Sequence, residues 1–243
     1  MIILYHYVPV ANGGKVLIAL HEKGIAFESR WVDLHKFEQH EPDYLKINPE
    51  GQVPTLVDDG QAITQTSVIN EYLEDAYPDA PKLRPDQPLE IARMRQWNKY
   101  IDDQVMQAVS IHGWQVNAGA IARAHSDEDF GRLVARIPLE QQRIKWRTAR
   151  EGFPQEKLDE ATRQVEEAVA RVEEALANGP WLLGEFYSLC DINFFAYCGG
   201  ALERMFPAIG NRETCPRVMD WVERMNARPG VARAMAIRAP EAA

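Results

Sequence analysis

The sequence has few cysteines and no long apolar run. Its three cysteines, Cys190, Cys198 and Cys215, form no Cys-x-x-Cys pair, which is typical of reduced thiols in the cytoplasm. No His or Cys stands at the spacing of metal ligands, so we expect no metal. No run of about 18 apolar residues is present, and the first eight residues, MIILYHYV, lack the basic region of a signal peptide. These absences predict a cytoplasmic protein without a membrane span.

An excess of positive charge is also missing. The 27 Lys and Arg residues face 36 Asp and Glu residues, which gives a net charge of -9. Such a chain repels nucleic acids and anionic membrane surfaces, so neither is expected as a partner. With 243 residues, 46% of them hydrophobic, the chain can form one large domain or two modest ones, each with a buried core.

The first 80 residues alternate strand-like and helix-like segments. Asp59-Gly60 suits a type I′ hairpin turn, and Gly24 suits the end of a helix. The last helix is expected to turn Val68, Ile69, Tyr72, Leu73 and Ala76 inward. The expected elements are, in order, a strand at 1–8, a helix at 13–24, a strand at 26–34, two strands within 53–64 and a helix at 66–78. This β-α-β-β-β-α order predicts a small mixed sheet with helices packed on it.

After a proline-rich segment, strand signals vanish. We place an N-terminal α/β domain at 1–80, a linker at 81–88 and a larger all-α domain at 89–243. Apolar residues recur at three- and four-residue steps from Ile91 to Val105 and again from Val165 to Leu176, which predicts amphipathic helices. The segment 191–206 is apolar nearly all round, which predicts a buried central helix.

Two turns of the N-terminal domain have the residues of a ligand site. A cis bond between Val53 and Pro54 would leave the Val53 backbone free to pair with an extended, peptide-like ligand. At Gln65-Thr66-Ser67 a strand gives way to a helix, whose N-terminus attracts anions, and Gln65 could accept from an ammonium group. Alternatively, Thr66 or Ser67 only caps the helix.

Together these features resemble the glutathione transferase superfamily. The matching features are the element order, the Val-Pro before the third strand, the Gln-Thr-Ser turn, the helical second domain and "SLCD" at 188–191. The last has the form of a capping box, which we interpret as a folding device and not as catalytic. The resemblance implies a thioredoxin-like N-terminal domain, glutathione as co-substrate and a homodimer.

A narrower resemblance is to the bacterial glutathione-dependent β-etherases of lignin breakdown. It rests on KFEQH, KINPEGQVP, VINEYLED, LRP, EQQ, KWR and AREGFP, and on an insertion at 130–155 that ordinary transferases lack. Taken alone, that basic insertion would be a solvated helix face. The resemblance implies an enzyme that cleaves the β-aryl ether bond of lignin-derived aromatic ketones. Thiolate attack would give a glutathione thioether and a phenol, with a small aromatic electrophile as second substrate.

The chain departs from this group at the first turn, "YHYVPVANGGKV". The residue after Asn12 is typically a serine beside the glutathione sulfur, but here it is Gly13, followed by Gly14. Backbone N–H groups of the two glycines, aided by the Asn12 amide, could stabilise a thiolate instead. Tyr7 is a second candidate, because "YVPV" resembles the strand end of the tyrosine-type transferases. Otherwise Tyr7 is an aromatic packed between the domains, and neither group activates the thiol.

The remaining site residues follow from matching positions. The expected glutathione contacts are Gln39, His40, Gln52, Val53, Pro54, Gln65 and Thr66. Gln65 stands where the related etherases have glutamate, and a neutral amide makes a weaker ammonium contact; His40 could equally be a surface histidine. An aromatic-lined electrophile site between the domains is expected from Trp97, Tyr100, Ile101, Gln104, His112, Trp114, Gln142 and Tyr197. Taken singly, each of these is more often a core or surface residue.

Three rival functions remain. A transferase or dehalogenase could act on another small aromatic electrophile. A glutathione-binding carrier or regulator with little catalysis would fit the missing serine. A disulfide reductase fits poorly, because no cysteine stands at the first turn.

Overall fold

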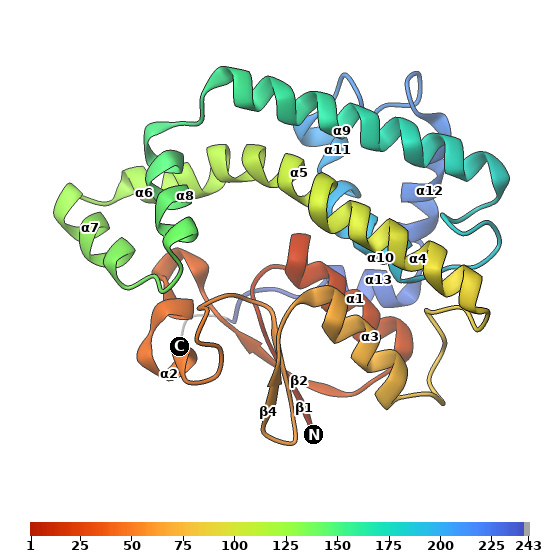
Figure 1. Cartoon of the computed structure of the whole chain (residues 1–243), viewed down its shortest axis with the longest axis horizontal. Coiled ribbons are helices and arrows are strands. Elements are labelled where there is room, and N and C mark those ends of the chain that lie inside the picture. Colours follow the sequence, from red (N-terminus) through yellow and green to blue (C-terminus); the bar gives the residue numbers. More distant parts are fainter. Residues whose placement is uncertain (241–243) are drawn as a thin grey trace.

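The N-terminal domain is built on a mixed four-stranded sheet. The computed structural model describes residues 1–240, and its strands are β1 (Ile2–His6), β2 (Phe27–Trp31), β3 (Thr55–Asp58) and β4 (Gln61–Ile63), in the order β2-β1-β3-β4 (Figure 1). β1 runs parallel to β2 and antiparallel to β3, and β4 is antiparallel to β3. Asp59 (φ 44°) and Gly60 (φ 79°) both have the positive φ that a type I′ turn requires. The predicted hairpin and the α/β fold class are confirmed.

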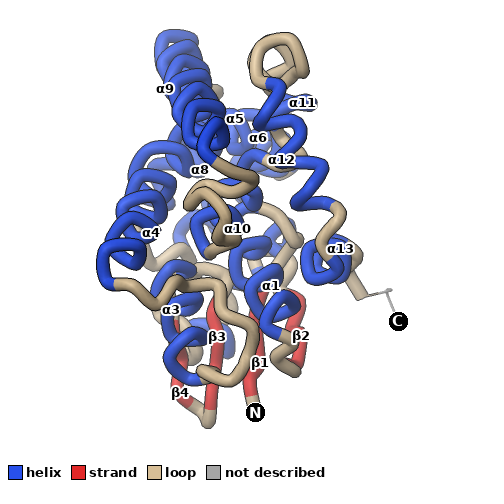
Figure 2. The backbone as a smooth tube through the Cα atoms, turned by 90° about the vertical axis from the view of Figure 1, so that its right-hand side faces the viewer, coloured by secondary structure: helices blue, strands red, loops and turns tan. Residues whose placement is uncertain are grey.

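Two helices pack on this sheet, and short helical turns fill the connection between β2 and β3. α1 (Ala11–Lys23) ends at Gly24, which is left-handed as expected, and α3 (Thr66–Ala76) follows the hairpin. The connection contains the 3₁₀ turns η1 (Leu34–Lys36) and η2 (Glu38–His40) and the helix α2 (Pro42–Leu45). Figure 2 shows α1 and α3 between the strands and the helices of the second domain. The N-terminal helices are therefore covered on both sides.

The inward face of α3 differs from the expected one. Val68 is 56% exposed and Ala76 is also exposed, whereas Asn70 and Glu74 are buried. Glu74 tolerates burial because its Oε1 accepts from Lys23 Nζ at 2.7 Å and from the Leu83 N–H at 3.2 Å. An apolar count along the helix therefore misses a face that is partly polar.

The second domain is entirely helical within the described residues. It comprises α4 (Pro88–Tyr100), the π-helical segment η3 (Ile101–Val105), α5 (Met106–Gly113), the π-helical segment η4 (Trp114–Ala118), α6 (Gly119–Ala124), α7 (Asp127–Ala135), α8 (Glu140–Glu151), α9 (Gln155–Ala175), η5 (Leu176–Asn178), α10 (Leu189–Cys198), α11 (Leu202–Met205), α12 (Pro216–Asn226) and α13 (Pro229–Met235). In Figure 1, α4 and α5 cross the molecule, with α9 on one side and the N-terminal domain on the other.

The predicted central helix is α10, and all of its residues are buried. It ends at Cys198, however, and the rest of the predicted segment 191–206 forms a turn at Gly199 and Gly200 and the short helix α11. Its capping box is present: the Ser188 N–H donates to Asp191 Oδ2 at 3.0 Å, and the Ser188 hydroxyl lies on the same carboxylate. Asp191 also accepts from the Leu182 N–H at 2.9 Å and from Trp221 Nε1 at 3.1 Å. The box thus ties α10 to the preceding loop and to α12, as a folding device should.

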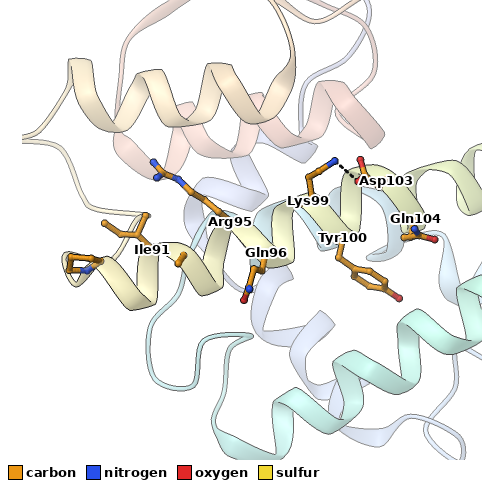
Figure 3. Close-up of a pocket in the computed structure, with 9 residues that line it drawn as sticks. Ile91, Arg95, Gln96, Lys99, Tyr100, Asp103 and Gln104 are labelled. Carbon is orange, nitrogen blue, oxygen red and sulfur yellow. Dashed lines mark hydrogen bonds and ion pairs between the residues drawn. The ribbon is translucent and has the colours of Figure 1, made fainter.

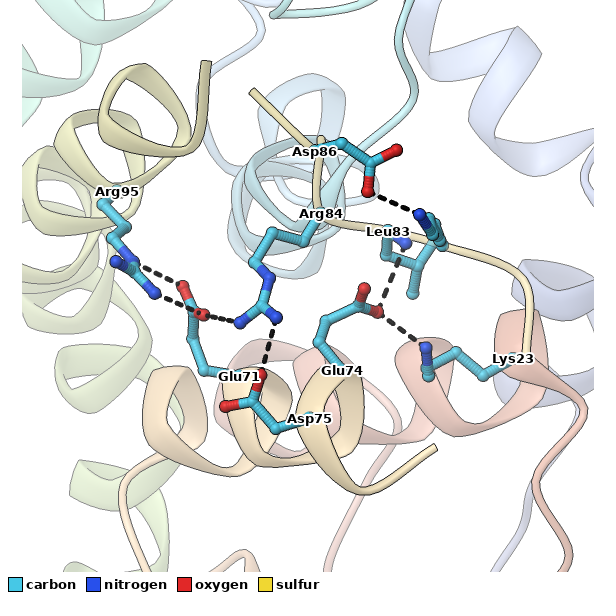
Figure 4. A network of polar contacts seen from close by, with 9 residues as sticks. Lys23, Glu71, Glu74, Asp75, Leu83, Arg84, Asp86 and Arg95 are labelled. Atoms are coloured by element: carbon cyan, nitrogen blue, oxygen red, sulfur yellow. Dashed lines mark hydrogen bonds and ion pairs between the residues drawn. The ribbon is translucent and has the colours of Figure 1, made fainter. Parts of the chain in front are cut away.

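Ion pairs connect the two domains around the linker (Figure 4). Glu71 of α3 accepts from Arg84 Nη1 at 2.8 Å and from Arg95 Nη2 of α4 at 2.9 Å. Lys23 Nζ, paired with Glu74, also donates to the Pro81 carbonyl at 3.2 Å. The linker is therefore bonded to helices of both domains.

A second, smaller core lies under α7 and α8. Phe37, from the turn between η1 and η2, is fully buried there. It packs with Ala122, Phe130, Val134, Ile137 and Trp146. The insertion predicted as a solvated face is thus anchored by its own apolar residues, and it holds a loop of the N-terminal domain.

A search of residues 1–240 for a membrane-spanning helix finds no candidate of the necessary length and hydrophobicity. The same residues contain no cluster of three His, Cys, Asp or Glu side chains suited to a metal. Cys190, Cys198 and Cys215 are buried thiols without a disulfide.

Candidate active site

Two free backbone donors lie at the β1–α1 turn. The Gly14 N–H donates to the Val10 carbonyl at 3.2 Å. The N–H groups of Asn12 and Gly13 find no acceptor within residues 1–240. These first-turn amides carry the positive end of the helix dipole. The expected donor set is therefore narrowed to Asn12 and Gly13, because the Gly14 amide is already used.

Both glycines sit under backbone carbonyls. A Cβ at position 13 would lie 2.6 Å from the Val8 oxygen. At position 14 it would lie 2.7 Å from the Pro9 oxygen and 3.5 Å from Ala196 Cβ. A serine at position 13 would require the backbone to move, so the glycine pair lets the turn close tightly against α1 and α10.

The Asn12 side chain is held by the second domain. Tyr197, on α10, is 5% exposed, and its hydroxyl donates to Asn12 Oδ1. Burial raises the pKa of Tyr197 far above its usual range, so the hydroxyl stays protonated. The structure thus brings Asn12 and Tyr197 together, with Tyr197 touching the turn itself.

A buried ion pair lies behind this turn. Lys15 is fully buried, and its Nζ lies 2.5 Å from Asp102 Oδ1 of η3 and 5.6 Å from the Tyr197 ring centroid. Ser67 Oγ donates to the other oxygen of Asp102. Burial lowers the pKa of Lys15, while Asp102 opposes that shift. The pair links the first turns of α1 and α3 across the domain boundary.

Tyr7 packs against aromatic rings of the N-terminal domain. Its ring lies 5.0 Å from that of Trp31 and 5.7 Å from that of His35, measured between centroids. Burial and the nearby Asp33 carboxylate both raise its pKa. Its phenolate is thus disfavoured, which leaves the neutral hydroxyl as the form that could act.

The Val53 backbone is free on one side, as expected. The Val53–Pro54 bond is cis, and neither the N–H nor the C=O of Val53 takes part in a backbone hydrogen bond among the described residues. The Gln52 carbonyl accepts from the Tyr44 hydroxyl at 2.6 Å and from Asn48 Nδ2 at 2.9 Å. These two bonds hold the loop from behind, so an extended ligand could pair with Val53.

The first turn of α3 is uncapped by side chains. Gln65 precedes it with a φ of 67°, in the left-handed region that is strained for a residue other than glycine. No side chain caps the helix, and the Ser67 hydroxyl is used by Asp102. The alternative that Thr66 or Ser67 merely caps the helix is therefore wrong, and the first-turn amides remain available to an anion.

Gln39 and His40 lie in η2 and are buried, at 6% and 5% exposure. Gln39 Oε1 and His40 Nδ1 have no hydrogen-bond partner within residues 1–240. Burial, and then the Arg136 charge, lower the pKa of His40 to about 4, so the ring is neutral at pH 7. His40 is thus not a surface histidine, and both residues carry polar atoms that a ligand could satisfy.

Three residues expected to line the electrophile site face away from the N-terminal domain. Arg171 of α9 lies over the rings of Trp97 and Tyr100, at 4.8 and 4.2 Å from its Cζ. His112 Nε2 lies 3.1 Å from Thr162 Oγ1, also of α9. α9 covers the side of α4 and α5 remote from the sheet (Figure 1). The structure therefore does not place these three residues between the domains. The side of η3 that carries Asp102 is the one that meets α1 and α3.

The other expected residues are dispersed. Gln104 belongs to a groove of about 670 Å³ along α4 and η3, which Tyr100 also lines; Arg95 and Lys99 point toward α3 there, and Tyr100 points the other way (Figure 3). Ile101 is fully buried in the core. Trp114 packs on Trp146, at 5.1 Å between centroids, and Gln142 lies half-buried in the first turn of α8.

The chain resembles known proteins along most of its length. The glutathione S-transferase N-terminal domain model matches residues 12–76, and the C-terminal domain model matches residues 137–229. Protein LigF of Sphingobium sp. strain SYK-6 is 45% identical over 233 residues, which cover 94% of this chain and 90% of LigF. The chain belongs to the glutathione S-transferase family.

Solved structures agree with this assignment. The crystal structure of the β-etherase LigF superposes on this transferase with a TM-score of 0.93 at 44% identity, covering 96% of this chain and 98% of the other. A glutathione transferase of Populus trichocarpa has a TM-score of 0.74 at 23% identity over 98% and 100% of the two chains. The second match supports the fold alone, and both confirm the predicted thioredoxin-like and all-helical halves.

Glutathione is the co-substrate of this family, and the N-terminal domain of this transferase has groups that fit it. The unsatisfied Nδ1 of His40 can donate to a carboxylate when it carries the ring proton, whereas the unsatisfied Oε1 of Gln39 only accepts and suits an N–H group. The free Val53 backbone suits a peptide. The open first turns of α3 and α1 suit an α-carboxylate and a thiolate. These are the places where the residues predicted from the sequence would hold it.

The sequence reasoning missed three residues at this site: Lys15, Asp102 and Arg136. Lys15 is the one charge in the apolar run "GGKVLIAL", and a charge on a buried helix face was an available signal. Arg136 Nη2 lies 2.5 Å from Glu41 Oε1 and 3.4 Å from the His40 carbonyl. No local sequence pattern predicts the contacts of Arg136, because they depend on how α7 packs against η2.

Proposed function

We propose that this transferase is a β-etherase that cleaves the β-aryl ether bond of lignin-derived aromatic ketones. The observation that carries the proposal is the 45% identity with LigF over 94% of this chain. The match to the β-etherase structure covers 96% of the chain, so the uncovered part is too short to contain the whole segment α7–α8. The inserted segment is therefore part of the similarity that supports the proposal.

The proposed reaction is a displacement at carbon. The glutathione thiolate attacks the carbon that bears the ether oxygen, so a C–S bond forms as the C–O bond breaks. The phenolate leaves with the electron pair and takes up a proton, equivalent to the one that the thiol lost. The products are a glutathione thioether and a phenol.

The chain's own residues must favour the thiolate. A free thiol has a pKa near 8.5, and each unit of depression requires about 1.4 kcal/mol of preferential stabilisation of the thiolate. The Asn12 and Gly13 N–H groups, at the positive end of α1, and the Asn12 carboxamide are the donors available at the turn. We assign the catalytic role to them, and Tyr7 is the alternative.

The other glutathione contacts are proposed by position. Gln65, Thr66 and the first turn of α3 would bind the γ-glutamyl end, and Val53, beside Pro54, would pair with the cysteinyl backbone. Gln39, His40 and Gln52 would reach the glycyl carboxylate. The open first turn of α3, the free Val53 backbone and the unsatisfied Nδ1 of His40 support these assignments.

The test is turnover of a chromogenic aryl β-ether ketone with glutathione, using each enantiomer separately. Phenol release from one enantiomer, with a thioether detected by mass spectrometry, is expected, and S-methylglutathione should release none. Glutathione binding without phenol release would overturn the etherase assignment. In that case, turnover of other aromatic halides or electrophiles would separate a different transferase from a non-catalytic carrier.

We also propose a cytoplasmic homodimer. Val68 and Leu89 are large apolar side chains left 56% and 63% exposed on α3 and α4, two helices joined by the Glu71–Arg95 pair. The three free, buried thiols suit a reducing compartment. Sedimentation should give twice the 27.6 kDa of one chain, and Val68→Glu should shift it to the monomer; a monomeric wild type would contradict the proposal.

A further inference from the structure

Tyr197 connects the centre of the helical domain to the proposed thiol site. It lies on the buried helix α10, and its hydroxyl meets Asn12 Oδ1 at the first turn of α1. A carboxamide oxygen can only accept, so the tyrosine must be the donor in this bond. Its raised pKa keeps the proton on the hydroxyl throughout the range in which a transferase works.

The geometry around this bond is fixed on three sides. α10 lies next to α1 at Gly14, where an added Cβ would be in ordinary contact with Ala196 Cβ at 3.5 Å. The Lys15 ammonium lies 5.6 Å from the centroid of the Tyr197 ring, which is a favourable cation–π distance. Asp102 holds that ammonium at 2.5 Å. The hydroxyl is therefore presented to Asn12 by packed and paired groups and not by a mobile side chain.

The bond decides which end of the Asn12 amide is available. With Oδ1 engaged, the two N–H bonds of Nδ2 remain, and the Asn12 side chain makes no other hydrogen bond within residues 1–240. The backbone N–H groups of Asn12 and Gly13, on the same turn, are also free. In the flipped orientation the amide would instead offer an oxygen, which repels a thiolate.

We propose that Tyr197 is a positioning residue which, by holding Asn12 Oδ1, presents the Asn12 Nδ2 donors to the glutathione sulfur. This inference rests on the proposed function, because the sulfur belongs to the co-substrate assigned there. It also explains what replaces the missing serine. The Val8 carbonyl leaves no room for a Cβ at position 13, and the oriented carboxamide of Asn12 takes the role of the serine hydroxyl.

The test is the variant Tyr197→Phe, studied first with glutathione alone. The pKa of the bound thiol is read from the ultraviolet absorbance of the thiolate as a function of pH. We expect a rise of about one unit, equivalent to about a tenfold loss of thiolate at a fixed pH below it. The dissociation constant of glutathione should stay within about twofold, and kcat should fall at neutral pH and recover at high pH.

A double-mutant cycle separates this role from a general loss of packing. In an Asn12→Ala background, Tyr197→Phe should change the thiolate fraction at a fixed pH and kcat by less than about twofold, because the group it positions is gone. Tyr187→Phe is the matched control: it removes a hydroxyl from a ring that lies against Trp181 and Arg228, away from the turn. It should titrate like the wild type.

The outcomes distinguish the two proposals. Suppose that the wild type binds and uses glutathione. The role of Tyr197 alone would then be overturned if Tyr197→Phe left the thiol pKa unchanged, or if it lowered kcat equally in the wild-type and Asn12→Ala backgrounds. A wild type that does not bind glutathione would overturn both. If Tyr197→Phe fails to fold, Asn12→Asp supplies the test, because it keeps an acceptor for Tyr197 and removes the donors: an unchanged thiol pKa would then refute the inference.

Discussion

Phe37 of the N-terminal domain lies against Trp146 of α8, with 4.6 Å between their ring centroids. Phe37 has a φ of 58° and no exposed surface, and it is adjacent to the turn that carries Gln39 and His40. Helix α8 of the insertion therefore packs against the loop that we assign to the glycyl carboxylate. Stability and glutathione affinity should depend on this one contact.

Phe37→Ala should lower the free energy of unfolding by about 3–5 kcal/mol, because it removes a fully buried ring from the smaller core. It should also weaken glutathione binding, since η2 loses its anchor. Urea unfolding and calorimetric titration would measure the two effects. Phe37→Leu, which preserves most of the volume, is the control and should cost less than about 1.5 kcal/mol. A destabilised Phe37→Ala variant with unaltered affinity would show that the insertion does not support this loop.

Gly13→Ser, which introduces the residue expected from the etherases, should not raise activity above that of the wild type. The added Cβ would meet the Val8 oxygen at 2.6 Å, and relieving such a clash should cost about 1–3 kcal/mol of stability. Thermal unfolding and turnover are the measurements. Gly113→Ala is the matched control, because a Cβ there meets nothing within 4 Å and should add up to about 1 kcal/mol. A Gly13→Ser variant that is both stable and faster would contradict the prediction.

The sequence predicted the elements of the N-terminal domain because they depend on local signals. Asp59-Gly60 specifies its turn through φ, and Gly24 ends α1, whatever the rest of the chain does. The inward face of α3 could not be predicted from local signals alone. Glu74 is buried there only because Lys23 and the linker supply its hydrogen-bond partners. Such a polar face cannot be read from hydrophobic spacing.

The candidate site divides in the same way. The cis Val53–Pro54 bond and the uncapped turn after Gln65 follow from short motifs, and both are present. Which residues of α4 and α5 face the N-terminal domain does not follow from the sequence, because it is set by the packing of α9 and α10 against these helices. Trp97 and Tyr100 have the composition of a ligand site, yet Arg171 covers them.

Asp191→Ala should be among the most damaging single changes in the helical domain. It would leave the N–H groups of Leu182 and Ser188 and the indole N–H of Trp221 buried without an acceptor. At about 1–3 kcal/mol for each unsatisfied group, a loss of at least about 3 kcal/mol is expected. Chemical unfolding would measure it. Asp191→Asn keeps one acceptor oxygen and should fall between the wild type and alanine; an alanine variant of wild-type stability would refute the structural role of the box.

Lys145 should give the protein a rise in stability at alkaline pH. Its Nζ donates to Ser110 Oγ at 2.9 Å and lies 4.6 Å from the Trp114 ring centroid, and no carboxylate within residues 1–240 pairs with it. Burial, and then the charge of Lys157, lower its pKa to about 8 from 10.5. Between these two values the unfolded chain binds more protons than the folded one, so the free energy of unfolding increases as the pH rises through this window.

Lys145→Met should therefore be more stable than the wild type at pH 7, by about 1–3 kcal/mol, and this advantage should shrink as the pH rises from 8 to 10.5. Denaturant titrations at a series of pH values would measure it. Lys145→Arg is the control, because a guanidinium stays protonated across the window and its stability should lack the alkaline rise. A wild-type protein and a methionine variant with parallel pH profiles would mean that the buried amine remains charged, and that Ser110 and Trp114 offset the loss of water around it.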